Sequence, residues 1–203
     1  MLPSAVFSQD DHHSQPSPER VFYFERQEVH IQEFEVAGPI LDLGGGGEGV
    51  IGRLKDSQVV AVDISKRELE EAPAGPLKIV MDATDLKFLD ASFNLVTACF
   101  TMMYIPEEDH QRVIEEAYRV LKRGGHLRIW DVVFPTRIEL NKDIAAFPMS
   151  ITLPKEEIDT GYGARWPADG RDTDHYAELA RSVGFKVVEL QKKDQWFLMR
   201  LEK

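Results

Sequence analysis

Five glycines within six positions form the part of this chain whose residue types best suit ligand chemistry. They are Gly44, Gly45, Gly46, Gly47 and Gly49. A strand-like segment, 40–43, runs directly into them, and a helix-like segment, 50–54, follows. Glycine adopts positive φ and has no Cβ, so such a turn lets the backbone approach a ligand closely. The first amides of a helix lack intrahelical partners, and we expect them to point outward. The turn therefore predicts a site for a nucleotide-like small molecule.

Two nucleotide-binding patterns compete for this turn. A phosphate-binding P-loop needs Lys and Ser or Thr directly after its last glycine. Two apolar residues follow Gly49 instead, which excludes that pattern. A dinucleotide fingerprint, G-x-G-x-x-G, is formally satisfied by Gly44, Gly46 and Gly49, although Gly52 interrupts the helix that it should open. The surrounding residues must decide between a dinucleotide and another adenosine ligand.

A carboxylate ends the next strand-like segment, 59–62. Asp63 stands about 20 residues past the first glycine, where a carboxylate can accept hydrogen bonds from both ribose hydroxyls. Its alternative role is to cap the helix that the Ser65–Glu68 capping box opens. The ribose role suits NAD and other adenosine ligands equally.

A second carboxylate, Asp82, ends the segment 78–81. It can accept a hydrogen bond from the exocyclic amine of adenine, while the Ala83 amide donates to a ring nitrogen. Ile64 and Met81 are placed to cover the faces of the ring. An acidic residue here suits an adenosine without a pyrophosphate, and the alternative is an ordinary turn aspartate.

Strands and helices alternate along the chain from residue 40 onward. The expected strands are near-continuous apolar runs, as in a parallel sheet covered on both faces, which predicts a doubly wound α/β fold. The last two strands are joined by a loop too short for a parallel crossover, so they must be antiparallel. The expected strands are 40–43, 59–62, 78–81, 93–100, 126–133, 185–190 and 196–201. Helices are expected from Ser65, from Pro106 to the stop at Gly124 and Gly125, and over about 172–183.

Ordered motifs from residue 40 to about 133 resemble one family. They are DLGGG at 42–46, Asp63, DA at 82–83, FNLV at 93–96 and RVLKRGG at 119–125. In this order they resemble the class I S-adenosylmethionine-dependent methyltransferases (methyltransferase type 11/25-like). The resemblance implies a Rossmann-like, doubly wound, mostly parallel sheet of seven strands. Its last strand is antiparallel, and a small insertion separates the fifth strand from the last helix.

The resemblance also implies S-adenosyl-L-methionine as the cofactor. The first carboxylate and the glycine backbone would hold the methionine end, and the backbone after the fourth strand would contact its amino group. Asp63 would bind the ribose and Asp82 with Ala83 the adenine. The implied cofactor-binding set is Asp42, Gly44, Gly45, Gly46, Asp63, Ile64, Asp82, Ala83, Phe100 and Thr101.

Two residues depart from the pattern of that family. Glu48 stands where a third glycine is usual, which leaves the local path of the turn open. Asn94 stands where Asp is common, and we expect little effect on catalysis because that position is mostly structural.

The chain is expected to form a flexible tail, 1–20, and a single methyltransferase domain, 21–203. One or two strands should precede the glycine turn. The segment 134–171 is expected to be a substrate-side insertion with a small hairpin. Tyr104, Tyr162 and Trp166 are the candidates for lining the acceptor pocket, and packing within the insertion is the alternative.

The implied reaction is direct displacement by a small-molecule acceptor, in which the protein positions the reactants and excludes water. No catalytic base is identified: His110 is expected to face solvent, and neither His126 nor His175 is distinctive. Two other functional hypotheses remain open. One is an NAD-dependent oxidoreductase, and the other is a non-catalytic S-adenosylmethionine-binding module.

Composition sets the class of partner. The net charge of −11 disfavours a nucleic-acid partner, because binding nucleic acids relies on Lys and Arg. No apolar run reaches the ~18–20 residues that span a bilayer, and no metal site or secretory signal is identified. We therefore expect a cytoplasmic enzyme that acts on a small molecule and not at a membrane.

Overall fold

The computed structural model describes residues 17–137, 139 and 141–203. Its residues fall into two compact units. The larger unit comprises 34–131, 173–192 and 197–203, and the smaller comprises the described residues of 1–33 and 132–172 together with 193–196. The expected N-terminal tail lies mostly outside the described residues, and Pro18–Arg20 within it form a short 3-10 helix.

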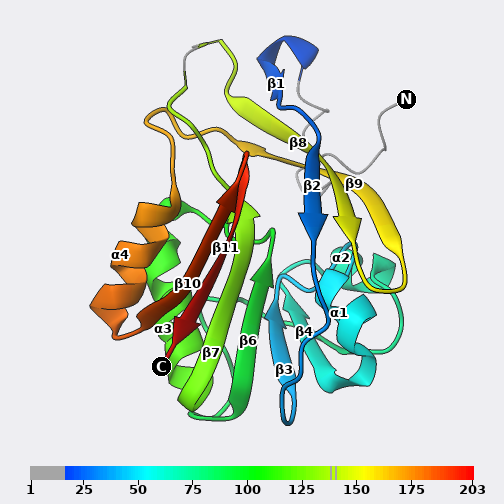
Figure 1. Cartoon of the computed structure of the whole chain (residues 1–203), viewed down its shortest axis with the longest axis vertical. Coiled ribbons are helices and arrows are strands. Elements are labelled where there is room, and N and C mark those ends of the chain that lie inside the picture. The colour runs from blue at the N-terminus through cyan, green and yellow to red at the C-terminus, as the bar shows by residue number, and fades with distance from the viewer. Residues whose placement is uncertain (1–16, 138, 140) are drawn as a thin grey trace. The chain divides into compact units, whose positions relative to one another are not determined.

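Seven strands form the sheet of the larger unit, and Figure 1 shows most of them side by side. The strand order is β10-β11-β7-β6-β3-β4-β5. The five strands from β7 to β5 pair in parallel. β11 runs antiparallel to β7. Lys203, directly after β11, exchanges backbone hydrogen bonds with Gly124 and Gly125 near the start of β7, and Gln195, directly before β11, accepts from Val133, directly after β7. The predicted fold is therefore confirmed. The strands are β3 (Ile40–Leu43), β4 (Val59–Asp63), β5 (Leu77–Val80), β6 (Phe93–Cys99), β7 (Leu121–Val132), β10 (Lys186–Lys193) and β11 (Trp196–Glu202).

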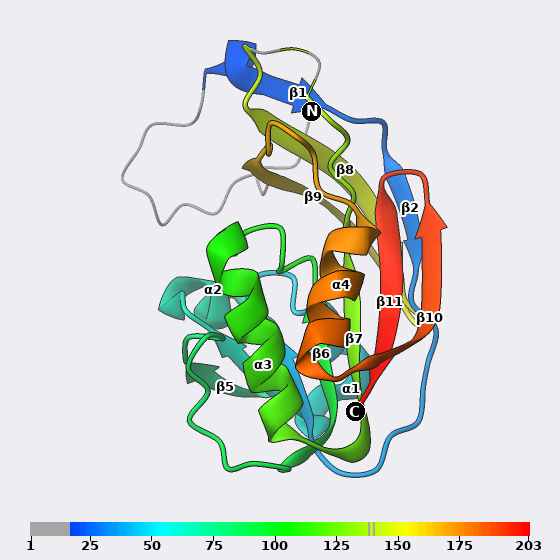
Figure 2. The same ribbon diagram turned by 90° about the vertical axis from the view of Figure 1, so that its left-hand side faces the viewer.

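Four α-helices of the larger unit complete the described part of its fold. They are α1 (Val50–Lys55), α2 (Lys66–Glu71), α3 (His110–Val120) and α4 (Thr173–Val183). Figure 2 shows α3 and α4 next to each other over one face of the sheet, with α1 on the other face. Within α3 the apolar residues Val113, Ile114, Ala117 and Val120 recur at helical spacing and are all buried. The capping box at α2 is confirmed, because Ser65 Oγ accepts a hydrogen bond from the Glu68 amide at 3.3 Å.

The predicted end of the helix from Pro106 was wrong. The chain first makes a 3-10 turn, Glu107–Asp109, and α3 then ends at Val120. Leu121 already pairs with Phe93 of β6, and the two glycines belong to β7. Strand pairing with β6 and β11 therefore takes over the backbone before the glycines are reached.

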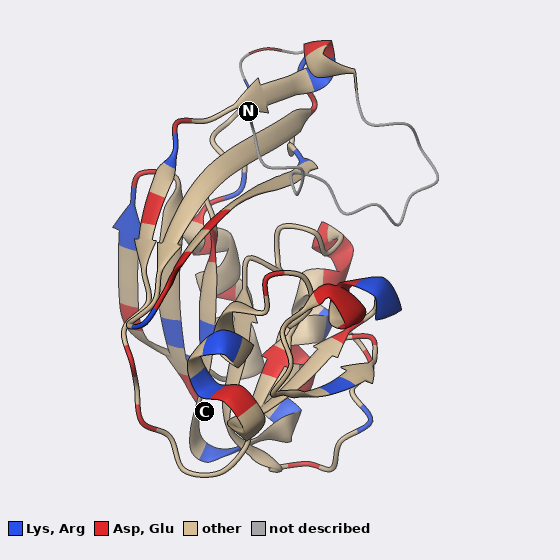
Figure 3. Cartoon of the chain, turned by 90° about the vertical axis from the view of Figure 1, so that its right-hand side faces the viewer, with Lys and Arg blue, Asp and Glu red and all other residues tan. Residues whose placement is uncertain are grey.

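The smaller unit has its own sheet. β8 (Ile144–Thr152) and β9 (Glu157–Arg165) form an antiparallel hairpin, which confirms and lengthens the predicted one. β1 (Val21–Tyr23) and β2 (Gln27–His30) pair in parallel with β8, one after the other along its other edge. The segment expected to be an insertion thus builds this unit together with the N-terminal strands. Within the described residues, no helix is both long and apolar enough to cross a membrane. Figure 3 shows acidic and basic residues interspersed over the ribbon.

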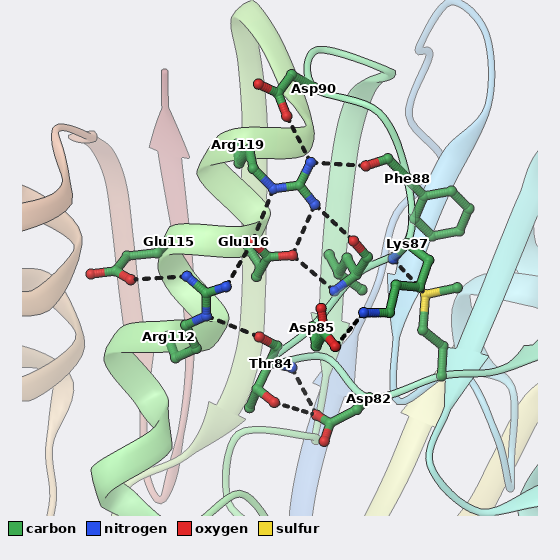
Figure 4. Close-up of polar contacts among 12 residues, drawn as sticks. Asp82, Thr84, Asp85, Lys87, Phe88, Asp90, Arg112, Glu115, Glu116 and Arg119 are labelled. Atoms are coloured by element: carbon green, nitrogen blue, oxygen red, sulfur yellow. Dashed lines mark hydrogen bonds and ion pairs between the residues drawn. The ribbon is translucent and has the colours of Figure 1, made fainter.

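An arginine clasp ties the segment after β5 to α3 (Figure 4). Arg119 donates to the carbonyls of Leu86 and Phe88, each at 2.8 Å, and to both carboxylate oxygens of Glu116. Glu116 is 3% exposed and also accepts from the Leu86 amide at 2.8 Å. Hydrogen bonding from Arg119 holds the pKa of the Glu116 carboxyl below its ordinary value. The clasp fixes the loop that begins at Asp82.

Replacing this guanidinium should loosen the loop. Arg119→Lys keeps the charge but loses the planar fork that reaches two carbonyls and a carboxylate together. We expect a loss of about 1–2 kcal/mol in unfolding free energy, measured by urea titration. The control is Arg123→Lys, at an exposed position, which should matter by less than about 0.5 kcal/mol. Equal effects of the two substitutions would contradict the clasp.

Candidate functional site

The glycine turn lies in direct contact with the neighbouring strand ends and α2. A Cβ at Gly44 would stand 2.4 Å from two side-chain atoms of Thr101, beyond the end of β6. A Cβ at Gly45 would stand 2.8 Å from the Ala61 Cβ on β4, and one at Gly46 would stand 2.5 Å from the Glu68 Cβ on α2. Gly44 also has φ +66°. The turn therefore needs glycine because the structure leaves no room for side chains.

Most amides of the glycine turn itself are paired within the protein. The Gly45 amide donates to Val62 O at 3.0 Å, Gly47 to Glu68 O at 2.9 Å and Gly49 to Gly46 O at 3.0 Å. Gly46 donates to Asp63 Oδ2 at a longer 3.3 Å. These bonds hold the turn against β4 and α2. A ligand at this turn would consequently not meet a row of unpaired glycine amides.

Asp63 ends β4 and is half-buried. Its Oδ1 accepts from the Ser65 amide at 2.8 Å, and its Oδ2 accepts the bond from Gly46. The helix-capping role considered as the alternative is therefore present. Each carboxylate oxygen has two lone pairs, so this capping role leaves acceptor capacity for ribose hydroxyls. The adjacent Ile64 side chain is 73% exposed, an unusual position for a large apolar residue.

The Asp82-Ala83 pair presents one acceptor and one donor. Asp82 is exposed, and its Oδ1 takes both hydrogen bonds from Thr84, each at 2.8 Å (Figure 4). Its Oδ2 accepts no hydrogen bond from the residues that the structure describes and can serve another donor. The Ala83 amide makes no hydrogen bond with any residue that the structure describes. An acceptor next to a free amide is the complement of the adenine edge, which carries an amine beside a ring nitrogen.

Asp42 is a buried carboxylate inside β3. It is 2% exposed and accepts a hydrogen bond from Thr97 Oγ1 at 2.6 Å on the adjacent strand β6. Burial raises its pKa from an ordinary 3.8 to about 7, against the opposing effect of the Thr97 hydrogen bond, and the nearby Asp63 charge adds to the rise. Because the charged form is the costly one, a cation bound near Asp42 would be favoured.

The turn after β6 is strained and firmly anchored. Phe100 is buried and has φ +54°, which is rare for a bulky residue and is typical of functional sites. Its amide donates to Trp130 O at 2.7 Å, while Thr101 Oγ1 donates to Leu43 O at 2.9 Å. The buried Asp131 accepts from the Met103 amide at 3.2 Å. These bonds bring Phe100 and Thr101 to the end of β3 and its glycine turn.

His110 also anchors this turn, and the expectation that it faces solvent was wrong. It is 0% exposed, and its Nε2 lies 3.1 Å from Met102 O and 3.0 Å from Ile105 O. Its Nδ1 lies 2.9 Å from Nε2 of His175 on α4, so His175 is distinctive after all. The sequence carried a signal for this burial, since His110 precedes Val113 and Ile114 by three and four positions on the apolar face of α3.

The three candidate acceptor residues lie in different units. Tyr104, in the turn after β6, is 42% exposed in the larger unit. Tyr162 and Trp166 belong to the smaller unit and are 7% and 3% exposed. Trp166 Nε1 donates to Pro135 O at 2.8 Å, and its ring lies 5.1 Å from that of Phe22. The contacts of Trp166 fit the alternative role, packing within the insertion.

A pair of glycine substitutions separates backbone strain from steric overlap. Gly44→Ala places a Cβ against Thr101, whereas Gly124→Ala, at φ +75°, meets nothing within 4 Å. Both variants lose about 1–2 kcal/mol of stability because alanine disfavours positive φ. Only Gly44→Ala loses a further amount of about 1–3 kcal/mol from steric overlap. Urea unfolding should therefore show the larger loss for Gly44→Ala. Similar losses in both variants would contradict the close contact of the turn with Thr101.

Asp42 should make stability depend on pH. Between about pH 4 and pH 7 the folded chain keeps a proton on Asp42 that the unfolded chain has released, so its contribution to stability falls as pH rises. Asp42→Asn retains the acceptor for Thr97 and removes the buried charge. We expect the variant to be more stable than the parent at pH 8, by on the order of 2–4 kcal/mol, with the difference vanishing near pH 4.

Urea unfolding at both pH values measures this difference. Glu108→Gln, at an exposed position, serves as the control and should change stability by less than about 0.5 kcal/mol at either pH. An Asp42→Asn variant that is no more stable than the parent at pH 8 would show that Asp42 is not a buried charge.

Several known proteins that resemble this chain are methyltransferases. Residues 41–129 match the model of a family described as methyltransferase domain. A chloroplastic 2-methyl-6-phytyl-1,4-hydroquinone methyltransferase 2 from Oryza sativa subsp. japonica is 32% identical over 162 residues, which are 75% of this chain and 40% of that protein. A demethylmenaquinone methyltransferase from Thermotoga maritima is 33% identical over 123 residues, 57% of this chain and 52% of that protein. The chain thus spans about half, or less, of the length of these curated relatives.

A solved structure shares the fold. It is a SAM-dependent methyltransferase from Methanosarcina mazei, with a TM-score of 0.59, 19% identity, and coverage of 84% of this chain and 94% of that one. The family match spans β3 to β7, the strands whose ends carry the glycine turn, Asp63 and the Phe100-Thr101 turn. Residues 41–129 thus carry a methyltransferase domain, and the relatives and the fold support a class I S-adenosylmethionine-dependent methyltransferase.

Proposed function

We propose that this chain transfers a methyl group from S-adenosylmethionine to a small-molecule acceptor by direct displacement. The observation that carries the proposal is the open pair formed by Asp82 Oδ2 and the Ala83 amide, at the sheet edge that also carries Asp63 and the glycine turn. These groups match an adenosine: an acceptor and a donor for the base, and a carboxylate for the ribose. The residues present fit the cofactor of the family.

Each part of the cofactor has its proposed residues. Asp63 would accept from the ribose hydroxyls, with the exposed Ile64 against the base. Asp42, whose charged form gains from a nearby cation, would favour the positively charged methionine end. The backbone of Gly44–46 would allow close approach there, and carbonyl groups of Phe100 and Thr101 would accept from its ammonium. When bound, S-adenosylmethionine supplies an activated methyl group.

The protein's own contribution is to position and enclose the reactants. An activated methyl donor needs no covalent help from the chain, so alignment of the acceptor and exclusion of water supply the rate. Tyr104 is the proposed acceptor contact in the larger unit because it is the exposed side chain of the turn after β6. Tyr162 and Trp166 stay candidates in the smaller unit.

The relatives suggest where to begin with acceptors. One is named for a hydroquinone and another for demethylmenaquinone. We therefore propose a hydroquinone-type ring as the first acceptor class to test. The cytoplasmic location and the lack of a nucleic-acid partner, both expected from the composition, stay predictions.

Calorimetry tests the cofactor and the role of Asp63 together. We expect S-adenosylmethionine and S-adenosylhomocysteine to bind, and NAD not to bind. Asp63→Ala should weaken S-adenosylhomocysteine binding about tenfold or more, because hydrogen bonds to its ribose are lost. Asp63→Asn keeps an acceptor for Ser65 and should weaken binding less. Asp159→Ala, an exposed carboxylate in the smaller unit, is the control and should leave the affinity unchanged.

Three outcomes would reject parts of this proposal. Binding of NAD alone would favour the oxidoreductase. Unchanged affinity in Asp63→Ala would remove Asp63 from the ribose site. The third outcome comes from an activity assay, in which methyl transfer from radiolabelled S-adenosylmethionine is measured first with hydroquinones and then with metabolite extracts. Binding of the cofactor with no transfer to any of them would favour the non-catalytic module.

A further inference from the structure

The hydrogen-bonding roles of the two histidines follow from their partners. His110 Nε2 faces two carbonyl oxygens, Met102 O and Ile105 O. Carbonyls only accept hydrogen bonds, so this nitrogen must carry a hydrogen and donate it. In the neutral ring the other nitrogen, Nδ1, is then an acceptor. His175 Nε2, at 2.9 Å, must therefore be the donor when both rings are neutral.

This arrangement has room for one additional proton but not two. One additional proton keeps a single hydrogen between the rings. It binds either His175 Nδ1, with His175 Nε2–H still donating to His110 Nδ1, or His110 Nδ1, with His175 shifting its own hydrogen to Nδ1 so that its Nε2 accepts. A second proton would place two N–H groups and two positive charges face to face at 2.9 Å. Such a pair titrates as a unit, and its second protonation must separate the rings.

The surroundings of His110 come from three elements. On α4, the titratable groups that face it are His175 and Tyr176, whose ring centroid lies 5.4 Å away. The turn after β6 presents its two carbonyls, and Asp131 of β7 holds the same turn through the Met103 amide. On its own helix, Val113 and Ile114 follow on the buried face.

The turn that His110 holds carries an exposed aromatic side chain at the candidate active site. Met102 and Met103 are 1% and 4% exposed, whereas Tyr104 between the two His110-bound carbonyls is 42% exposed. The turn begins directly after Thr101, which contacts Gly44 and Leu43. Its internal hydrogen bonds, from Tyr104 N to Thr101 O and from Ile105 N to Met102 O, make it a compact unit. The position of His110 therefore sets the position of Tyr104.

We propose that His110, oriented by His175, is a positioning residue for methyl transfer: it holds the 102–105 turn in place for the acceptor, and double protonation of the histidine pair releases that turn. The inference rests on the proposed methyl transfer at this edge of the sheet. Activity should fall on the acid side as the second proton binds, below the ordinary histidine pKa of about 6.5, through the acceptor step and not through loss of the cofactor.

Two variants of His110 separate its hydrogen bonds to the turn from its ability to take up a proton. His110→Gln places an amide nitrogen near the position of Nε2, where its two hydrogens can serve both carbonyls, and it cannot take up a proton. His110→Asn places its amide near Nδ1 and leaves both carbonyls without their donor. The glutamine variant should retain transfer within about threefold and lose the acid-side fall that the pair causes. The asparagine variant should lose about tenfold or more in kcat/KM for the acceptor.

NMR spectroscopy tests the link between the histidine pair and the 102–105 turn, and it needs no methyl acceptor. In protein labelled with ¹⁵N-histidine and bound to S-adenosylhomocysteine, His110 Nε2 should stay protonated across the titration. The amide signals of Met103 and Tyr104 should shift with the second proton of the pair, and His110→Gln should abolish that shift. Two histidines that titrate independently, or turn amides that ignore the pair, would overturn the proposal.

The activity arm uses labelled S-adenosylmethionine and a water-soluble methyl-1,4-hydroquinone over pH 5–9. Calorimetry with S-adenosylhomocysteine should give affinities within about threefold for the parent and both variants, and thermal melting checks that each is folded. Equal kcat/KM in His110→Gln and His110→Asn would overturn the positioning role. A parent that fails to bind S-adenosylhomocysteine contradicts the proposed function instead. A parent that binds it but leaves this probe unmethylated rejects that acceptor, and the spectroscopy then decides the inference.

Discussion

The candidate site depends on the contact between the glycine turn and the end of β6. Thr101 Oγ1 donates to Leu43 O, and the side chain of Thr101 occupies the space that a Cβ at Gly44 would need. Parallel pairing of β3 with both β4 and β6 brings the three strand ends to one edge of the sheet. The glycine turn, Asp63 and the Phe100-Thr101 turn can therefore face one ligand. A side chain at Gly44 would push the first and the last of these apart.

The carboxylates at this edge of the sheet differ in burial, and burial decides how easily each of them carries a charge. The Asp42 carboxylate lies inside the sheet, where desolvation raises its pKa to about 7, while Asp82 is exposed. Burial also raises the pKa of the Cys99 thiol well above its ordinary value, with the nearby Asp42 and Asp131 adding to the effect, so this thiol is not a ready nucleophile. An arrangement of this kind suits the binding of an activated, positively charged donor. It offers no covalent catalysis by cysteine.

The sheet could be predicted because its strands are apolar runs separated by helices, and the glycine turn and the strand-end carboxylates are local signals. Features that depend on distant pairing could not be predicted. Gly124 and Gly125 are typical of a helix stop, yet Lys203, the residue after β11, forms backbone hydrogen bonds with both of them. Val21 pairs with Ile144 in the smaller unit, and no local pattern specifies such a partner. His110 looked solvent-facing because its partner, His175, comes from another helix.

The central claim is that the edge of the sheet formed by β3, β4 and β6, with the segment after β5, binds the adenosine of S-adenosylmethionine. A crystal structure with S-adenosylhomocysteine bound tests it most directly. The account predicts that Asp63 accepts from the ribose hydroxyls, and that Asp82 Oδ2 and the Ala83 amide bind the adenine edge. A complex in which the base lies away from Asp82, or in which the nucleoside binds elsewhere on the chain, would contradict it.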